Sequence, residues 1–281
     1  MWEIIKAVIY GIVEGITEWL PISSTGHLIL VESFLPFEET SENFFGMFDV
    51  VIQLGAILAV VVLFWKQIWP FALTKKEREG RTGAAAYFKK DIWILWMKIL
   101  VSCVPAAVIG VLFDEQFEKL FYNPICIAIA LIVFGVAFIA VENWNKGRKA
   151  KVTGLAEITY TTALLIGFFQ LIAAIFPGTS RSGATIVGAL LIGVSRTVAA
   201  EYTFFLAIPV MFGASLLKVV KFGFDFLPTE LLLLAVGTVV SFVVSLLVLR
   251  FLMGYIKKHD FKVFGWYRIA LGIVVLLYFR G

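Results

Sequence analysis

Long apolar segments constrain this chain more than any other feature of its sequence. Six of them can cross the hydrocarbon core of a bilayer, which is about 30 Å thick and takes roughly 20 helical residues. They cover residues 48–65, 92–113, 124–141, 199–219, 229–255 and 263–279. Their apolar residues are continuous, whereas the strands of a membrane β-barrel would alternate. We therefore expect an all-α polytopic membrane protein with six full transmembrane helices, because a helix satisfies its own backbone hydrogen bonds in lipid.

The composition agrees with this class. Hydrophobic residues make up 60% of the 281-residue chain, against about 45–50% in soluble domains. The net charge of +4 is small, so we expect a lipid environment and no nucleic-acid partner. Cys103 and Cys126 lie inside apolar runs, where we expect them to pack rather than to form a disulfide or bind a metal.

Two further apolar regions, residues 2–35 and 157–194, are interrupted near their middle. Each contains a proline followed by small hydroxyl residues, which break a helix at membrane depth. The pieces on either side of the break are too short to cross the bilayer alone. We expect each region to form a re-entrant helix–loop–helix pair, whose irregular backbone is tolerated in a membrane only where protein or a cavity covers it.

The two interrupted regions carry copies of one pattern, GIVEGITEWLPISSTGH (11–27) and GFFQLIAAIFPGTSRSG (167–183). A gapless alignment pairs Gly11 with Gly167, Ile16 with Ile172, Pro21 with Pro177, Ser24 with Ser180, Ser23 with Thr179 and Glu14 with Gln170. Each half then holds one re-entrant pair and three spans, and because three is odd the second half must start on the opposite face. The sequence predicts a single membrane domain, 1–281, built from a first repeat, 1–150, and an inverted second repeat, 151–281.

Charge in the loops predicts the orientation of the chain. Lys and Arg are concentrated in three loops, at residues 66–90, 146–151 and 257–262, which the expected topology places on one face. By the positive-inside rule this face is cytoplasmic. Both termini and the first re-entrant pair would then face outward, with Lys218 and Lys221 as exceptions on that side.

The first copy of the pattern holds two carboxylates, Glu14 and Glu18, which are four residues apart and therefore share one helix face. Ionisable groups in membrane segments indicate function by default. Two interpretations stay open at this point. The pair can hold a divalent cation such as Mg²⁺ or Ca²⁺ through oxygen ligands, or it can transfer protons.

A hydroxyl and an imidazole follow in the same copy. Ser24 and His27 are three residues apart, close enough for a contact that would activate the serine as a nucleophile. The alternative is that Ser23, Ser24 or Thr25 caps the helix that starts there, which does not exclude catalysis by another hydroxyl. The second histidine, His259, lies among Lys257, Lys258 and Asp260 and is expected in a solvated loop.

The second copy lacks these groups and holds an arginine instead. Its PGTSRSG loop offers phosphate-binding candidates at the start of a helix: Arg181 with Gly178, Thr179, Ser180 and Ser182. Backbone N–H groups at a helix N-terminus favour anions, and arginine presents a bidentate fork to phosphate. The alternative for Arg181 is a structural ion pair with Glu14 or Glu18. Asp49 and Gln53, one turn apart on the first full span, are weaker candidates for lining the site.

Four segments together resemble one family of membrane enzymes. EGITEWLPISSTGH (14–27) and PGTSRSGAT (177–185) are similar to the two signature motifs of the undecaprenyl-pyrophosphate phosphatases of the bacitracin-resistance type, and FDVVIQLGAILAVV (48–61) and GVSR (193–196) extend the similarity. The resemblance implies removal of the terminal phosphate of undecaprenyl pyrophosphate, which recycles the lipid carrier of cell-wall synthesis. It also implies an active site on the outer face of the bacterial cytoplasmic membrane. Glu14, Glu18, Ser24, His27 and Arg181 would be the functional residues.

The expected mechanism assigns a role to each of these groups. Arg181 and its loop hold the pyrophosphate, and Ser24 or a water attacks the terminal phosphorus with His27 as the proton-transfer partner. Glu18 orients His27 or Ser24. The alternative function is transport of a lipid or an anion, alone or alongside hydrolysis, because inverted repeats with broken helices are also the architecture of transporters. A need for metal, a homodimer and the preferred isoprenoid length stay open.

Overall fold

The structure, a computed structural model, describes residues 1–78 and 83–279. Regular structure within these residues is helical apart from two isolated backbone bridges. Six of the described helices are long and apolar enough to cross a membrane: α3 (Phe44–Leu63), α6 (Lys90–Phe121), α7 (Pro124–Trp144), α10 (Arg196–Phe222), α11 (Pro228–Tyr255) and α12 (Lys262–Phe279). The prediction of an all-helical protein with six such helices is confirmed. α6 continues well past the predicted end at 113 because a helix does not have to stop where its apolar run stops.

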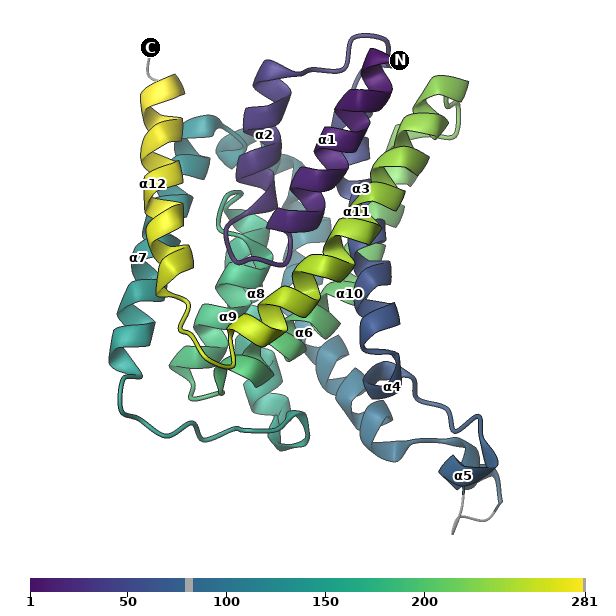
Figure 1. Ribbon diagram of the computed structural model, residues 1–281, viewed down its shortest axis with the longest axis vertical. Helices are drawn as coiled ribbons and strands as arrows, with labels where there is room; N and C mark the ends of the chain where they lie inside the picture. Colours follow the sequence, from purple (N-terminus) through teal and green to yellow (C-terminus); the bar gives the residue numbers. More distant parts are fainter. Residues whose placement is uncertain (79–82, 280–281) are drawn as a thin grey trace.

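The two interrupted regions form helical hairpins. In the first hairpin, α1 (Trp2–Thr17) and α2 (Ser24–Phe34) flank the first loop, residues 18–23. In the second hairpin, α8 (Tyr160–Ile175) and α9 (Arg181–Leu191) flank the second loop, residues 176–180. Figure 1 shows α1 descending from the N-terminus to a turn in the middle of the molecule, from which α2 returns toward the same end. The remaining described helices are short: α4 (Trp65–Ile68), α5 (Lys75–Arg78), η1 (Ala84–Tyr87) and η2 (Leu155–Glu157).

Each loop ends in a serine that caps the following helix, and the two caps are shifted by one residue relative to the gapless alignment. Ser23 and Ser180 are the N-caps of α2 and α9, with φ angles of 75° and 69°, and their hydroxyls accept from the backbone N–H groups of Gly26 and Gly183. The alignment of Ser24 with Ser180 is therefore wrong for this segment, because one residue separates Pro21 from the cap Ser23, whereas two residues separate Pro177 from the cap Ser180. Ser24 instead matches Arg181, and each is the first residue of its helix.

Small residues let the hairpins pack tightly against long helices, as is common in membrane bundles. A Cβ at Gly11 of α1 would lie 2.7 Å from the Gly237 carbonyl oxygen of α11. A Cβ at Gly167 of α8 would lie 2.5 Å from the Ser102 carbonyl oxygen of α6. The first hairpin thus rests on α11 and the second on α6. Trp19 anchors the first loop in the core, edge-on to Phe204 of α10 with 5.3 Å between ring centroids.

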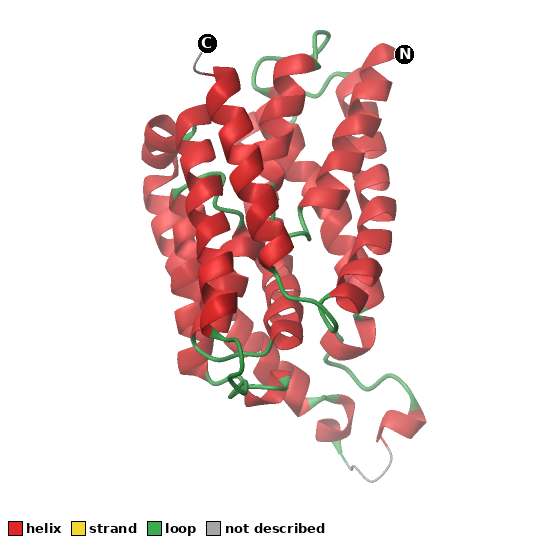
Figure 2. Cartoon of the chain, turned by 60° about the vertical axis from the view of Figure 1, so that its left-hand side comes forward, coloured by secondary structure: helices red, strands yellow, loops and turns green. Residues whose placement is uncertain are grey.

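The termini and the basic loops lie at opposite ends of the bundle. Both termini lie at one end, and the basic segments around α4 and α5 and between α7 and α8 lie at the other (Figure 1). Figure 2 shows the same separation, with most helices running along the long axis between the two ends. Of the basic residues in the loop 66–90, Arg81 lies outside the described residues.

Close packing of α3 on α11 makes a testable claim about stability. Gly55→Ala should destabilise the protein, because the added Cβ would lie 2.1 Å from the Thr238 carbonyl oxygen. Overpacking of this kind costs about 1–3 kcal/mol, and the midpoint of thermal unfolding in detergent measures it. Gly213→Ala on α10 is the control, since a Cβ there meets no atom within 4 Å. Equal midpoints for the two variants would contradict the packing.

Candidate functional site

The two loops meet on one carboxylate, that of Glu18 at the C-terminal end of α1. The Ser24 hydroxyl donates a hydrogen bond of 2.8 Å to its Oε2. The Arg181 guanidinium donates one of 2.9 Å from Nη2 to its Oε1, which is also an ion pair. The ion pair that the sequence left open as the alternative for Arg181 is thus present, with Glu18 as its partner. A hydroxyl from the first hairpin and a cation from the second are thereby held on either side of one buried acid.

Further contacts fix the orientation of Arg181. Its Nη1 donates to the Thr203 carbonyl oxygen of α10 at 2.8 Å, whereas its Nε is buried without a hydrogen-bond partner. Ser182 ties the second loop to the first, because its hydroxyl donates to the Glu18 carbonyl oxygen at 3.2 Å. The guanidinium is therefore held through both terminal nitrogens, and the Nε–H bonds to no group among the described residues.

His27 does not contact Ser24, which corrects the expectation drawn from their spacing. Its Nδ1 lies 2.6 Å from the Ser23 carbonyl oxygen and its Nε2 lies 2.7 Å from the Tyr267 hydroxyl. A carbonyl oxygen only accepts, so Nδ1 carries the proton and Nε2 accepts from Tyr267. The two rings are stacked, with an angle of 3° between their planes. Ser24 turns away because, as the first residue of α2, it projects toward Glu18.

Glu14 lies one turn before Glu18 and is fully buried, and among the described residues neither of its carboxylate oxygens has a hydrogen-bond partner. Buried polar groups normally have hydrogen-bond partners, so a buried carboxylate without one indicates a place where a ligand or an ion binds. Gln170, its counterpart on α8, is also buried with both side-chain polar atoms unpaired. Among the described residues, no group of three or more His, Cys, Asp or Glu side chains is arranged to hold a metal. Glu14 is the residue best placed to hold one together with ligands from a substrate.

The other phosphate-binding candidates of the second loop have different surroundings. Ser180 caps α9, and its hydroxyl lies 3.1 Å from that of Ser182. Thr179 has a buried hydroxyl without a partner. Gly178 has a φ of 89°, and a Cβ there would lie 2.7 Å from the Ile127 carbonyl oxygen. Ser180 and Ser182 are thus engaged within the protein, whereas Thr179 keeps a hydroxyl to offer, and only glycine fits at 178.

Two residues of α12, Tyr267 and Arg268, complete the site and were missed from the sequence. Tyr267 orients His27, as described above. Arg268 is fully buried and donates to the carbonyl oxygens of Pro21, Gly178 and Thr179 at 3.2, 3.0 and 2.7 Å. A signal for Arg268 was present, because a charged residue inside a predicted span indicates function by default.

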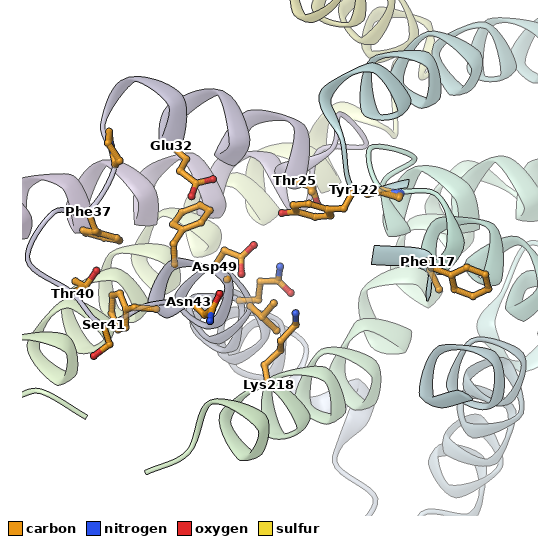
Figure 3. A pocket seen from close by; sticks show the side chains of 18 of the residues that line it. Thr25, Glu32, Phe37, Thr40, Ser41, Asn43, Asp49, Phe117, Tyr122 and Lys218 are labelled. Atoms are coloured by element: carbon orange, nitrogen blue, oxygen red, sulfur yellow. The ribbon is translucent and has the colours of Figure 1, made fainter. Parts of the chain in front are cut away.

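A cavity of about 610 Å³ is lined by Thr25, at the start of α2, and by Pro177 of the second loop. Figure 3 shows Glu32 of α2 and Asp49 of α3 reaching toward the same space, with Tyr122 across from them. Asp49 and Gln53 were expected to line the site, and both line this cavity. Its lining also includes residues of the segment between α2 and α3, at the end of the molecule that holds both termini. The cavity offers a polar approach to the loops from that end.

Comparison with known proteins identifies the family. The family model described as bacitracin resistance protein BacA matches residues 7–274. The chain belongs to the BacA family. A protein of Desulfitobacterium hafniense named undecaprenyl-diphosphatase is 62% identical, and the match covers 99% of this chain and 96% of that protein. Undecaprenyl-diphosphatase 1 of Clostridium acetobutylicum is 61% identical over 99% of this chain and 97% of the relative. An undecaprenyl-diphosphatase of Enterococcus faecalis is 59% identical over 98% and 96%.

These matches confirm the resemblance noted in the sequence, and they cover nearly the whole chain. Both loops lie inside the range that the BacA model matches, as do Tyr267 and Arg268 of α12. The site is therefore built entirely from the part of the chain that defines the family.

The shared carboxylate predicts energetic coupling between the hairpins. Glu18→Gln and Arg181→Gln should each destabilise the protein, because each leaves a largely buried charge without its partner. The double variant should lose less than the sum of the two, with a coupling energy of about 0.5–3 kcal/mol. Thermal unfolding of the four proteins in one detergent measures the cycle. Strictly additive losses would show that the two side chains are not in contact.

Proposed function

We propose that this chain is an undecaprenyl-diphosphatase, which removes the terminal phosphate of undecaprenyl pyrophosphate and returns undecaprenyl phosphate for cell-wall synthesis. The observation that carries the proposal is the Glu18 carboxylate, which holds the Ser24 hydroxyl on one oxygen and the Arg181 guanidinium on the other. A nucleophile, a proton acceptor and an anion-binding group are thus in direct contact. The names of relatives at 59–62% identity support the choice of substrate.

The geometry supports a substitution at phosphorus with Glu18 as the base. Arg181 and the Thr179 hydroxyl bind the terminal phosphate at the N-terminal end of α9. The Ser24 oxygen attacks the terminal phosphorus while Glu18 takes the hydroxyl proton. The bond between that phosphorus and the bridging oxygen breaks, Glu18 passes its proton to that oxygen, and undecaprenyl phosphate leaves. Water then attacks the phosphoserine and gives one proton to Glu18, which returns it to the Ser24 oxygen as the bond between phosphorus and that oxygen breaks and inorganic phosphate leaves.

This mechanism changes the role expected for His27. The histidine is committed through both nitrogens to Ser23 and Tyr267, so it fixes the residue that caps α2 instead of receiving the Ser24 proton. Glu18 takes over the proton transfer because its carboxylate is the group that the hydroxyl touches. His27 is then a positioning residue, whose loss would misplace Ser24.

A divalent cation fits the same site. Mg²⁺ is usually bound by one or two carboxylates together with substrate phosphates, and the orphaned Glu14 carboxylate beside Glu18 matches that pattern. Glu14 and Glu18 would hold the ion. When bound, it would neutralise charge on the phosphate oxygens.

The membrane arrangement belongs to the same proposal. The two hairpins are re-entrant elements of a single membrane domain, residues 1–281, in which residues 151–281 repeat residues 1–150 with inverted topology. The basic loops face the cytoplasm and both termini face outward, so the cavity opens at the outer face of the bacterial cytoplasmic membrane. The position of both termini at the end opposite α4 and α5 in Figure 1 supports this orientation. The isoprenoid tail would lie along the helices in the surrounding lipid.

Removal of the Ser24 hydroxyl tests the nucleophile. We expect kcat for phosphate release from undecaprenyl pyrophosphate to fall on the order of 10³-fold or more in Ser24→Ala, as removal of a nucleophile does elsewhere. Ser33→Ala is the matched control, because Ser33 lies on the same helix and its hydroxyl only bonds the Leu30 carbonyl oxygen. Full activity in Ser24→Ala would leave water as the nucleophile, and no release by the wild type would refute the phosphatase.

Titration with magnesium tests the cation site. Chelation should abolish phosphate release by the wild type, and added Mg²⁺ should restore it. Glu14→Gln should need at least about tenfold more Mg²⁺ for half-maximal rate, because altering a site's partners lowers metal affinity by roughly 10- to 100-fold. Unchanged activity after thorough chelation would remove the metal from the proposal.

A further inference from the structure

Arg268 is a buried cation that the mechanism above does not use. It lies on α12 with no solvent exposure, and within residues 1–78 and 83–279 the structure pairs it with no carboxylate. Its partners are backbone carbonyl oxygens, including that of Leu131 on α7 at 3.4 Å. Burying an unpaired charge is costly, so such residues persist where they do something specific.

The partners of Arg268 occupy equivalent places in the two loops. Pro21 lies two residues before the N-cap of α2, and Gly178 lies two residues before the N-cap of α9. Nη1 donates to the Pro21 carbonyl oxygen at 3.2 Å and Nη2 to the Gly178 carbonyl oxygen at 3.0 Å. Nη2 also donates to the Thr179 carbonyl oxygen at 2.7 Å. One planar side chain therefore spans the gap between the two hairpins.

Arg268 on α12 has no arginine counterpart at the matching position of α7. α7 and α12 cross where Gly135 and Gly265 approach each other's backbone, so that a Cβ added at either glycine would lie 2.7–2.8 Å from the other's carbonyl oxygen. Arg268 stands three positions after Gly265, and the residue three positions after Gly135 is Phe138, which is fully buried in the core. The arginine is thus specific to α12 and is not shared by α7.

We propose that Arg268 is a positioning residue that sets the register of the first loop against the second, so that Ser24 and Arg181 meet the same phosphate. The proposal rests on the proposed phosphatase function and adds a residue to it. Glu18 and Arg181, which meet in the site, are 163 positions apart in the sequence, and a misplacement of about 1 Å can cost roughly 100-fold in rate. A guanidinium suits this task because its rigid fork presents several donors in one plane.

Arg268→Lys tests whether Arg268 holds the two loops together, since a single ammonium keeps the charge but cannot bond both loops in the geometry of a planar fork. We expect kcat to fall by about 100-fold with KM changed by less than about threefold. Arg268→Gln, which removes the charge and keeps a side-chain amide donor, should be impaired at least as strongly. Arg250→Lys is the control, because Arg250 lies exposed on α11; it should keep wild-type kcat.

Hydrogen exchange followed by mass spectrometry supplies a readout independent of activity. In Arg268→Lys, exchange should rise in residues 18–23 and 176–180 together, while α10 and α11 keep wild-type protection. Wild-type kcat in both Arg268 variants would overturn the proposal, and so would a loss of kcat with unchanged exchange in the loops or with increased exchange throughout the protein. If the wild type released no phosphate, the phosphatase function would fail, and the exchange experiment would still decide whether Arg268 holds the loops.

Discussion

The Glu18 carboxylate is the point on which the rest of this structure depends. Its two oxygens accept from Ser24 and Arg181, residues that two separate hairpins deliver to the middle of the bundle. A carboxylate buried in an apolar protein needs partners for its lone pairs, and the pair of donors supplies them. The same contacts place a hydroxyl next to a base and a guanidinium next to the place where phosphate would bind, so stabilisation of the buried acid and assembly of the site are one event.

The two copies of the pattern share the backbone geometry of the helix cap but differ in the side chain that follows it. Each hairpin caps its second helix with a serine at positive φ, at Ser23 and Ser180. The residue that follows the cap is Ser24 in one hairpin and Arg181 in the other. Equivalent backbone positions thereby present a hydroxyl and a guanidinium to the same carboxylate, that of Glu18.

The sequence predicted the helices well and the contacts within the site only in part. Continuous apolar runs indicate which segments can form long membrane helices, so the six long helices and both breaks at proline were found, although α6 ends at Phe121 and not at the predicted residue 113. Ser24 and His27 were expected to touch because spacing along a helix says which residues are near, but not which of several acceptors a hydroxyl chooses. Arg268 and Tyr267 were missed because their partners lie far away in the sequence. The gapless alignment could not reveal that the second copy has one more residue between its proline and its cap.

The position of bound substrate tests the central claim most directly. A structure of the wild-type protein with a non-hydrolysable methylene analogue of undecaprenyl pyrophosphate would locate both phosphorus atoms. The account predicts that the terminal phosphate lies between the two loops, hydrogen-bonded to Arg181, with its phosphorus facing the Ser24 hydroxyl oxygen. A terminal phosphate bound away from either loop, in contact with only one hairpin, would contradict the conclusion that the two hairpins form one site.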